Sequence, residues 1–172
     1  MILPFFDWIL SFGKYKIEPI KIEVMQISEN GINVIKRFEG FESKPYKDVA
    51  GVPTIGYGAT YYPNGKTVTM NDKPITEAEA TEMLRYMVKS YANGVDRYVQ
   101  QPINQNQFDA LTSFAYNLGL GALKGSTLLK KVNKNPNDPD IKNQFMRWVN
   151  AGGRVVKGLV VRREYESKLY FS

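Results

Sequence analysis

Residues 38–60 read FEGFESKPYKDVAGVPTIGYGAT. The segment places Glu39 at the predicted end of a helix, Asp48 in a turn and Thr54 on the strand that follows. We expect these three side chains to meet in one cleft. Cleavage of a glycosidic bond needs one protonated carboxyl group, which donates to the leaving oxygen, and one carboxylate, which favours attack on the sugar carbon. The segment therefore predicts a sugar-cleaving enzyme.

The helix that carries Glu39 has clear boundaries in the sequence. Ser28 is its predicted N-cap, and Gly40 is the residue at which it is expected to end. Glu39 thus lies at the C-terminal end, where the helix dipole and the neighbouring phenylalanine rings disfavour a carboxylate and suit a proton donor. Taken alone, Glu39 would be a solvated helix-end residue and Asp48 an ordinary turn former.

The rest of the chain alternates sheet and helix signals. Residues 44–68 predict a small antiparallel sheet with tight turns. A capping box at residues 76–79 opens a long helix over 76–99, long enough to join two lobes. A broad apolar stripe after the cap Asn104 predicts the central helix of a helical lobe. We expect glycines to interrupt it before a helix at 126–132, and further helices over 141–148 and 159–170, with loops at 133–139 and 150–153. The list of interrupting glycines is Gly119, Gly121 and Gly125.

The first 24 residues differ from the rest. Residues 1–12 have a broad apolar face at helical spacing, and a helix of that length would measure about 18 Å against a hydrocarbon core of roughly 30 Å. A short strand signal follows from Ile20 to Val24. We interpret residues 1–24 as an extension of the domain. It is either an interfacial anchor to the membrane or envelope, or a segment without that function, namely a helix docked on the domain or a remnant of expression. Residues 25–172 form the predicted catalytic domain.

Composition narrows the chemistry. The chain has 172 residues, with no Cys and no His. Thiolate catalysis, Cys-based metal sites and histidine bases are therefore excluded, and acid chemistry falls to carboxylates. We expect no metal and no organic cofactor. The length predicts one domain or two small lobes with a shared core, and we expect a monomer.

Charge is concentrated near the C-terminus. The net charge is +6, and residues 120–172 hold eleven basic and four acidic side chains. Such a surface attracts anionic polymers, for example peptidoglycan or lipopolysaccharide, or an anionic membrane. We expect no nucleic-acid partner, because no nucleic-acid-binding motif accompanies the charge. A basic surface that is simply solvated explains the lysine residues within 120–172 equally well.

The spacing of Glu39, Asp48 and Thr54 resembles that found in the phage lysozyme family, whose members are muramidases. In that family the catalytic Glu is followed after nine positions by Asp and after six more by Thr, as Glu39, Asp48 and Thr54 are here. Later blocks resemble the lambdoid endolysin branch in the same order: SFAYNLG at 113–119, STLL at 126–129, RW at 147–148 and GLVVRRE at 158–164. The resemblance runs from about Met25 to the C-terminus. Many relatives carry a His where this chain has Ala59.

The resemblance implies a fold and a reaction. The fold would be α+β and lysozyme-like, with a small β-sheet lobe and a larger helical lobe joined by a long helix. The reaction would be hydrolysis of the β-1,4 bond between N-acetylmuramic acid and N-acetylglucosamine in peptidoglycan. Glu39 would protonate the leaving oxygen, while Asp48 and Thr54 would hold the attacking water. The resemblance also implies roles for five further residues. Tyr116, Asn117 and Thr127 would contact the substrate. Arg162 and Arg163 would orient Glu39.

Other functions remain open at this point. A lytic transglycosylase needs only one acid, and a peptidoglycan- or membrane-binding protein needs none. The apolar N-terminus could also permeabilise membranes by itself. The resemblance favours an endolysin encoded by a phage, made in the host cytoplasm and acting on the cell wall in the periplasm. The two adjacent arginines could equally be a solvated basic turn.

Overall fold

The computed structural model describes residues 24–172. The helix predicted over residues 1–12 and the strand signal that begins at Ile20 fall on residues 1–23, outside this described part. Within residues 24–172, no helix combines the length and the apolar character needed to cross a bilayer.

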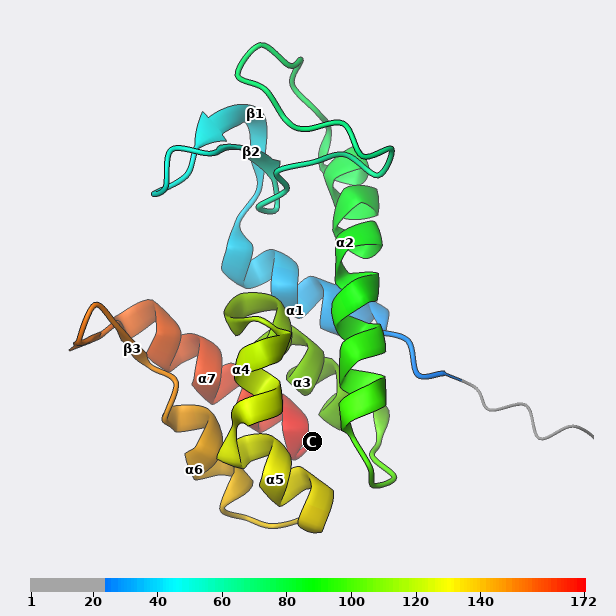
Figure 1. Ribbon diagram of the computed structural model, residues 1–172, viewed down its shortest axis with the longest axis vertical. Helices are drawn as coiled ribbons and strands as arrows, with labels where there is room; N and C mark the ends of the chain where they lie inside the picture. The colour runs from blue at the N-terminus through cyan, green and yellow to red at the C-terminus, as the bar shows by residue number, and fades with distance from the viewer. Residues whose placement is uncertain (1–23) are drawn as a thin grey trace, which may run out of the picture.

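Seven helices and four short strands make up the described part of the chain. In chain order they are α1 (Glu29–Glu39), β1 (Glu42–Lys47), β2 (Pro53–Gly56), α2 (Glu77–Tyr98), α3 (Gln105–Leu118), α4 (Leu120–Gly125), α5 (Thr127–Lys134), α6 (Ile141–Met146), β3 (Asn150–Ala151), β4 (Arg154–Val155) and α7 (Lys157–Tyr170). Figure 1 shows β1 and β2 at one end of the molecule, α3 to α7 at the other, and α2 running between them. The α+β, two-lobed prediction is confirmed.

Helix α1 begins and ends where the sequence predicts. The Ser28 hydroxyl accepts a hydrogen bond from the backbone N–H of Gly31, as an N-cap does. At the other end, Gly40 has φ +75°, a backbone conformation that side chains rarely adopt, and the helix stops there. Glu39 is therefore the last helical residue.

The predicted sheet is present but small. Strands β1 and β2 are antiparallel, with Tyr46 opposite Thr54 and Lys47 opposite Pro53. Two isolated antiparallel bridges extend the pattern, one from Ile55 to Ala59 and one between residues 61 and 67. Regular pairing thus covers only part of residues 44–68, and turns make up the remainder.

Helix α2 connects two hydrophobic cores. Its capping box is formed as predicted, because the Thr76 hydroxyl accepts from the Glu79 N–H and the Glu79 carboxylate accepts from the Thr76 N–H. At 22 residues the helix is about 33 Å long. Its first half packs against the sheet through Leu84 and its neighbours, and its second half, with Val95, packs in the helical lobe.

Helix α3 is the centre of the helical lobe. In its predicted stripe, Phe108, Leu111, Phe114 and Ala115 are at most 1% exposed, and Leu118 is partly buried against the same core. The helix packs against α7, α2 and α1, so it fixes the position of the C-terminal helix relative to α1. The predicted stripe is confirmed.

The predicted glycine breaks are confirmed at Gly119 and Gly125 and wrong at Gly121. Gly119, with φ +90°, ends α3, and α4 ends at Gly125 before α5 begins, but Gly121 lies inside α4. Packing overrides the low helix propensity of glycine here. Leu123 of α4 is fully buried, and Leu120 lies so close to Gly94 of α2 that a Cβ there would be 2.4 Å from its Cδ2 atom.

The other C-terminal predictions hold with small changes. Helix α6 ends at Met146, before the predicted 148, and α7 begins at Lys157, two residues earlier than expected. The loop predicted at 150–153 contains the turn of the β3–β4 hairpin, in which Asn150 pairs with Val155.

Candidate active site

A cleft of about 270 Å³ lies where α1, the segment after β2, α2 and the end of α3 come together. Its lining residues are Glu39, Tyr57, Gly58, Thr60, Tyr61, Met87, Tyr91, Tyr116 and Asn117. They come from both the sheet-bearing segment and the helical lobe. The lining combines one carboxylate with four tyrosines, an arrangement suited to a polar ligand with flat apolar faces.

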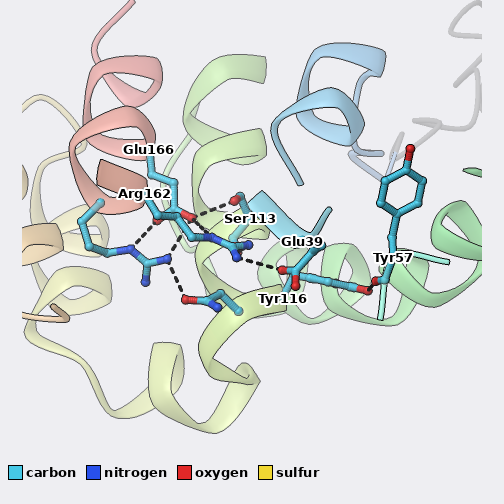
Figure 2. Close-up of polar contacts among 8 residues, drawn as sticks. Glu39, Tyr57, Ser113, Tyr116, Arg162 and Glu166 are labelled. Carbon is cyan, nitrogen blue, oxygen red and sulfur yellow. Dashed lines mark hydrogen bonds and ion pairs between the residues drawn. The ribbon is translucent and has the colours of Figure 1, made fainter. Parts of the chain in front are cut away.

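Glu39 is the acidic residue of this cleft. Its side chain is 23% exposed, and its Oε1 atom accepts a hydrogen bond of 2.8 Å from Nη1 of Arg162 on α7. The Arg162 side chain is only 4% exposed. A guanidinium group held in the protein interior thus fixes one oxygen of a carboxyl group that remains accessible from the cleft (Figure 2).

The two adjacent arginines have different partners. Arg162 contacts Glu39, whereas Nη2 of Arg163 donates to Oδ1 of Asn117 at 2.9 Å. Arg163 is fully buried, and its guanidinium lies 5.0 Å from the centre of the Phe114 ring. Neither arginine is part of a solvated basic turn. Of the two predicted to orient Glu39, only Arg162 touches it.

Tyr116 and Asn117 line the cleft, as the resemblance implies. The Tyr116 hydroxyl donates to the backbone oxygen of Tyr57 at 3.1 Å, which ties α3 to the segment after β2. Burial, helped by the negative charge of Glu39, raises the pKa of Tyr116 well above its usual range. Tyr116 therefore stays a neutral hydrogen-bond donor.

Asp48 closes the turn between β1 and β2. Its Oδ1 atom accepts from the backbone N–H groups of Ala50 and Val52, both at 2.8 Å. This is the turn-forming role that an Asp often has. Both bonds use Oδ1, so Oδ2 is available to hold a water molecule or a ligand.

Thr54 lies on β2 and is only 3% exposed. Its hydroxyl donates to the backbone oxygen of Val52 at 3.0 Å. Tyr46 is its cross-strand partner. Burial raises the pKa of Tyr46, and the negative charges of Glu42, Asp48 and Glu39 raise it further, so both predicted catalytic carboxylates lie within electrostatic reach of one ring. Asp48 and Thr54 are not among the residues that line the Glu39 cleft.

Thr127 occupies a different pocket. This pocket, of about 310 Å³, is lined by Gly125, Ser126, Thr127, Gln144, Arg147 and Trp148. It lies where α4, α5 and α6 meet, and none of its lining residues is shared with the Glu39 cleft. A substrate contact by Thr127 stays a prediction and requires a ligand that extends beyond that cleft.

Several residues of the site carried no distinct signal in the sequence. Met87 and Tyr91 lie on α2 among apolar residues at helical spacing, a pattern typical of core, yet both line the cleft. Ser113 and Glu166 are buried behind Arg162, where the Ser113 hydroxyl donates to Glu166 at 2.7 Å. A Ser and a Glu inside predicted helices look ordinary until the helices are packed, so no sequence signal would have found them.

Comparisons with known proteins give one consistent result. Residues 36–166 match the family described as phage lysozyme. An endolysin of Bacillus phage B103 is 44% identical over 148 residues, covering 86% of this chain and 55% of the relative. An endolysin of Salmonella phage P22 is 38% identical over 149 residues, covering 87% of this chain and 100% of the relative. This chain spans about half the length of the Bacillus phage relative.

A solved structure agrees with the sequence matches. The endolysin from Escherichia coli O157:H7 phage FAHEc1 is similar with a TM-score of 0.80 and 36% identity. The alignment covers 87% of this chain and 96% of that one. The similarity therefore includes both lobes and the connecting helix.

Proposed function

Because this chain belongs to the phage lysozyme family, we propose that it is an endolysin that hydrolyses the β-1,4 bond between N-acetylmuramic acid and N-acetylglucosamine in bacterial peptidoglycan. The observation that carries the proposal is the placement of Glu39. A carboxyl group at the end of a helix faces a cleft of nine residues and is held from behind by the buried guanidinium of Arg162. Such a group is positioned to protonate a leaving glycosidic oxygen.

Asp48 and Thr54 supply the second half of the proposed reaction. The Thr54 hydroxyl already donates to Val52, so it can only accept a further hydrogen bond from a water molecule. Oδ2 of Asp48 is likewise an acceptor. A water that donates one hydrogen to each of them would direct its lone pair away from both, towards the sugar carbon. The carboxylate of Asp48 would also stabilise the positive charge that develops on the sugar.

Digestion of purified peptidoglycan tests this function against its alternatives. The new ends are identified by mass spectrometry after incubation with the purified chain. We expect reducing N-acetylmuramic acid ends. Anhydro ends would instead assign a lytic transglycosylase, in which the sugar's own hydroxyl attacks. Absence of cleavage would assign a peptidoglycan-binding protein.

Thr54→Val should lower the rate of peptidoglycan hydrolysis by about fivefold. The change removes one hydrogen bond to the proposed water, worth about 1 kcal/mol, and roughly 1.4 kcal/mol corresponds to a factor of ten. Thr54→Ser is the matched control, because it keeps the hydroxyl and should retain most of the rate. Turnover of a soluble peptidoglycan fragment measures both. Equal rates for the two variants would remove Thr54 from the water site.

We also propose that residues 1–24 bring the enzyme to the envelope and contribute little to bond cleavage. Every proposed catalytic residue follows Met25, whereas residues 1–12 are almost entirely apolar. The basic C-terminal third would add attraction to an anionic membrane or to lipopolysaccharide. We further propose that the protein is encoded by a phage, is made in the host cytoplasm, acts on the cell wall and is a monomer.

A chain that begins at Met25 should cleave isolated peptidoglycan at close to the full rate. It should bind anionic liposomes less well than the full chain and act less well on whole cells, because it lacks the apolar segment. Liposome co-sedimentation and a cell-lysis assay measure the two effects. Equal liposome binding by both forms would contradict the anchor, and unfolding of the shorter form would instead favour a docked helix.

A further inference from the structure

We propose that Glu166 is a positioning residue for Glu39, because it holds the guanidinium of Arg162 and shares its positive charge. In this arrangement Glu39 is not the sole counter-ion of Arg162, so the attraction of Arg162 for the Glu39 carboxylate is weaker than it would be without Glu166. The inference deepens the proposed function and rests on the role of Glu39 as the proton donor.

Glu166 accepts its hydrogen bonds through Oε1, whereas Oε2 is in ion-pair contact with Arg163 but accepts no hydrogen bond. It lies on α7 and is 0% exposed. Its Oε1 atom accepts from the Ser113 hydroxyl at 2.7 Å, from Nε of Arg162 at 3.2 Å and from Nη2 of Arg163 at 3.1 Å. Its Oε2 atom lies 2.9 Å from Nε of Arg163. Burial raises the pKa of Glu166, while both guanidinium groups and the Ser113 hydroxyl oppose that rise. A carboxylate is the form that this set of donors fits.

Arg162 joins this buried group to the cleft. Its Nε donates to Glu166, its Nη2 lies 3.4 Å from the backbone oxygen of Ser113, and its Nη1 donates to Glu39 at 2.8 Å. The guanidinium is planar and rigid, so two interior contacts determine where the third nitrogen points. Figure 2 shows the resulting chain of contacts from Glu166 and Ser113 through Arg162 to Glu39.

Charge sharing follows from the same geometry. The row Glu39, Arg162, Glu166 and Arg163 alternates in sign, and its last three members are at most 3% exposed. Water screens these charges weakly, so the loss of one member is felt by the next. Without the negative charge of Glu166, the full attraction of Arg162 would fall on Glu39 and favour its carboxylate, which cannot act as a proton donor.

Other charged and titratable groups near Glu39 come from several elements. Arg162 and Arg163 lie on α7, Tyr116 on α3 and Tyr46 on β1. The cleft also contains Tyr91 of α2 and, after β2, Tyr57 and Tyr61. Burial raises the pKa values of Tyr116, Tyr46 and Tyr57, so these three remain neutral at the pH of the reaction. The arginine charges do not change in that range, so removal of the Glu166 charge is a clean perturbation.

The test is an NMR titration of the Glu39 side-chain carboxyl in the full chain and in Glu166→Gln. We expect the midpoint to fall by about half a pH unit or more, since a cation within hydrogen-bond distance strongly favours a carboxylate. The alkaline limb of the pH profile of kcat should move to lower pH by the same amount. At a pH above the midpoint, kcat should therefore be lower by roughly threefold. KM should change little, because Glu166 is not a lining residue of the cleft.

Two further variants separate this role from a purely structural one. Ser113→Ala removes a donor that favours the Glu166 carboxylate, so Glu166 carries less negative charge and the Glu39 midpoint should fall, as in Glu166→Gln but by less. Tyr170→Phe, the control, removes a buried hydrogen bond from the same helix to Pro136 and should leave the midpoint unchanged. A variant that is merely less stable, but still folded, should keep the Glu39 midpoint of the parent chain.

The outcomes decide the inference in each case. An unchanged midpoint in folded Glu166→Gln would overturn it. If Glu166→Gln fails to fold, Ser113→Ala decides: a lowered midpoint supports charge sharing, and an unchanged or raised one overturns it. The titration does not require activity, so a parent chain that fails to cleave peptidoglycan would defeat the proposed function while the midpoints still decide the coupling.

Discussion

Glu39→Gln is expected to lower the rate of peptidoglycan hydrolysis by about 10²–10⁴-fold, the usual contribution of a general acid. The amide keeps the shape of the side chain and an oxygen that can accept from Arg162, but it has no proton to give to the leaving sugar. The melting temperature should therefore change little. Rates on a soluble peptidoglycan fragment and a thermal melt of the same preparation measure both quantities.

The matched control is Glu42→Gln, because Glu42 is an exposed carboxylate on β1, three residues further along the chain. It should keep the full rate. A folded Glu39→Gln protein that retained most of the activity would remove Glu39 from the proposed role, and the protonation of the leaving group would have to come from elsewhere.

Phe114→Ala is expected to destabilise the protein by about 3–5 kcal/mol, the typical loss for a large buried aromatic residue. Phe114 is fully buried at the centre of the helical lobe. Its ring packs edge-on against Phe145 and Trp148, with centroid distances of 5.8 and 5.5 Å, and lies under the guanidinium of Arg163. For a protein of this size the melting temperature should fall by roughly 10 °C.

Phe171→Ala provides the comparison for this variant. Phe171 follows α7 and is 45% exposed, so its removal leaves little cavity and should lower the melting temperature by far less. Denaturant or thermal unfolding measures the difference. Equal losses for the two variants would mean that the packing around Phe114 does not dominate the stability of the lobe.

Local signals in the sequence determined most of the secondary structure. The caps at Ser28, Thr76 and Asn104 each bind a backbone N–H three residues later, and Gly40 ends α1 as predicted. These features depend on contacts within a few residues, so they can be predicted from residues that are neighbours in the sequence. The same holds for the apolar stripe of α3, because helical periodicity is itself a local property.

The spacing of Glu39, Asp48 and Thr54 indicated the family through likeness, since intervals along the chain do not by themselves place side chains in space. Glu39 lines the cleft, whereas a site shared by all three residues stays a prediction. The helix α4, which runs through Gly121, was not predicted, because the burial of Leu123 outweighs the local preference of glycine.

Only the tertiary structure decided which of two adjacent arginines reaches Glu39. Arg162 and Arg163 are equivalent in the sequence, but successive residues of a helix point about 100° apart, so one contacts Glu39 and the other contacts Asn117. The role of Glu166 depends likewise on α7 packing against α3, which brings it to Ser113 across 53 residues of sequence. Contacts of this kind arise from the packing of whole helices, and no short stretch of sequence contains them.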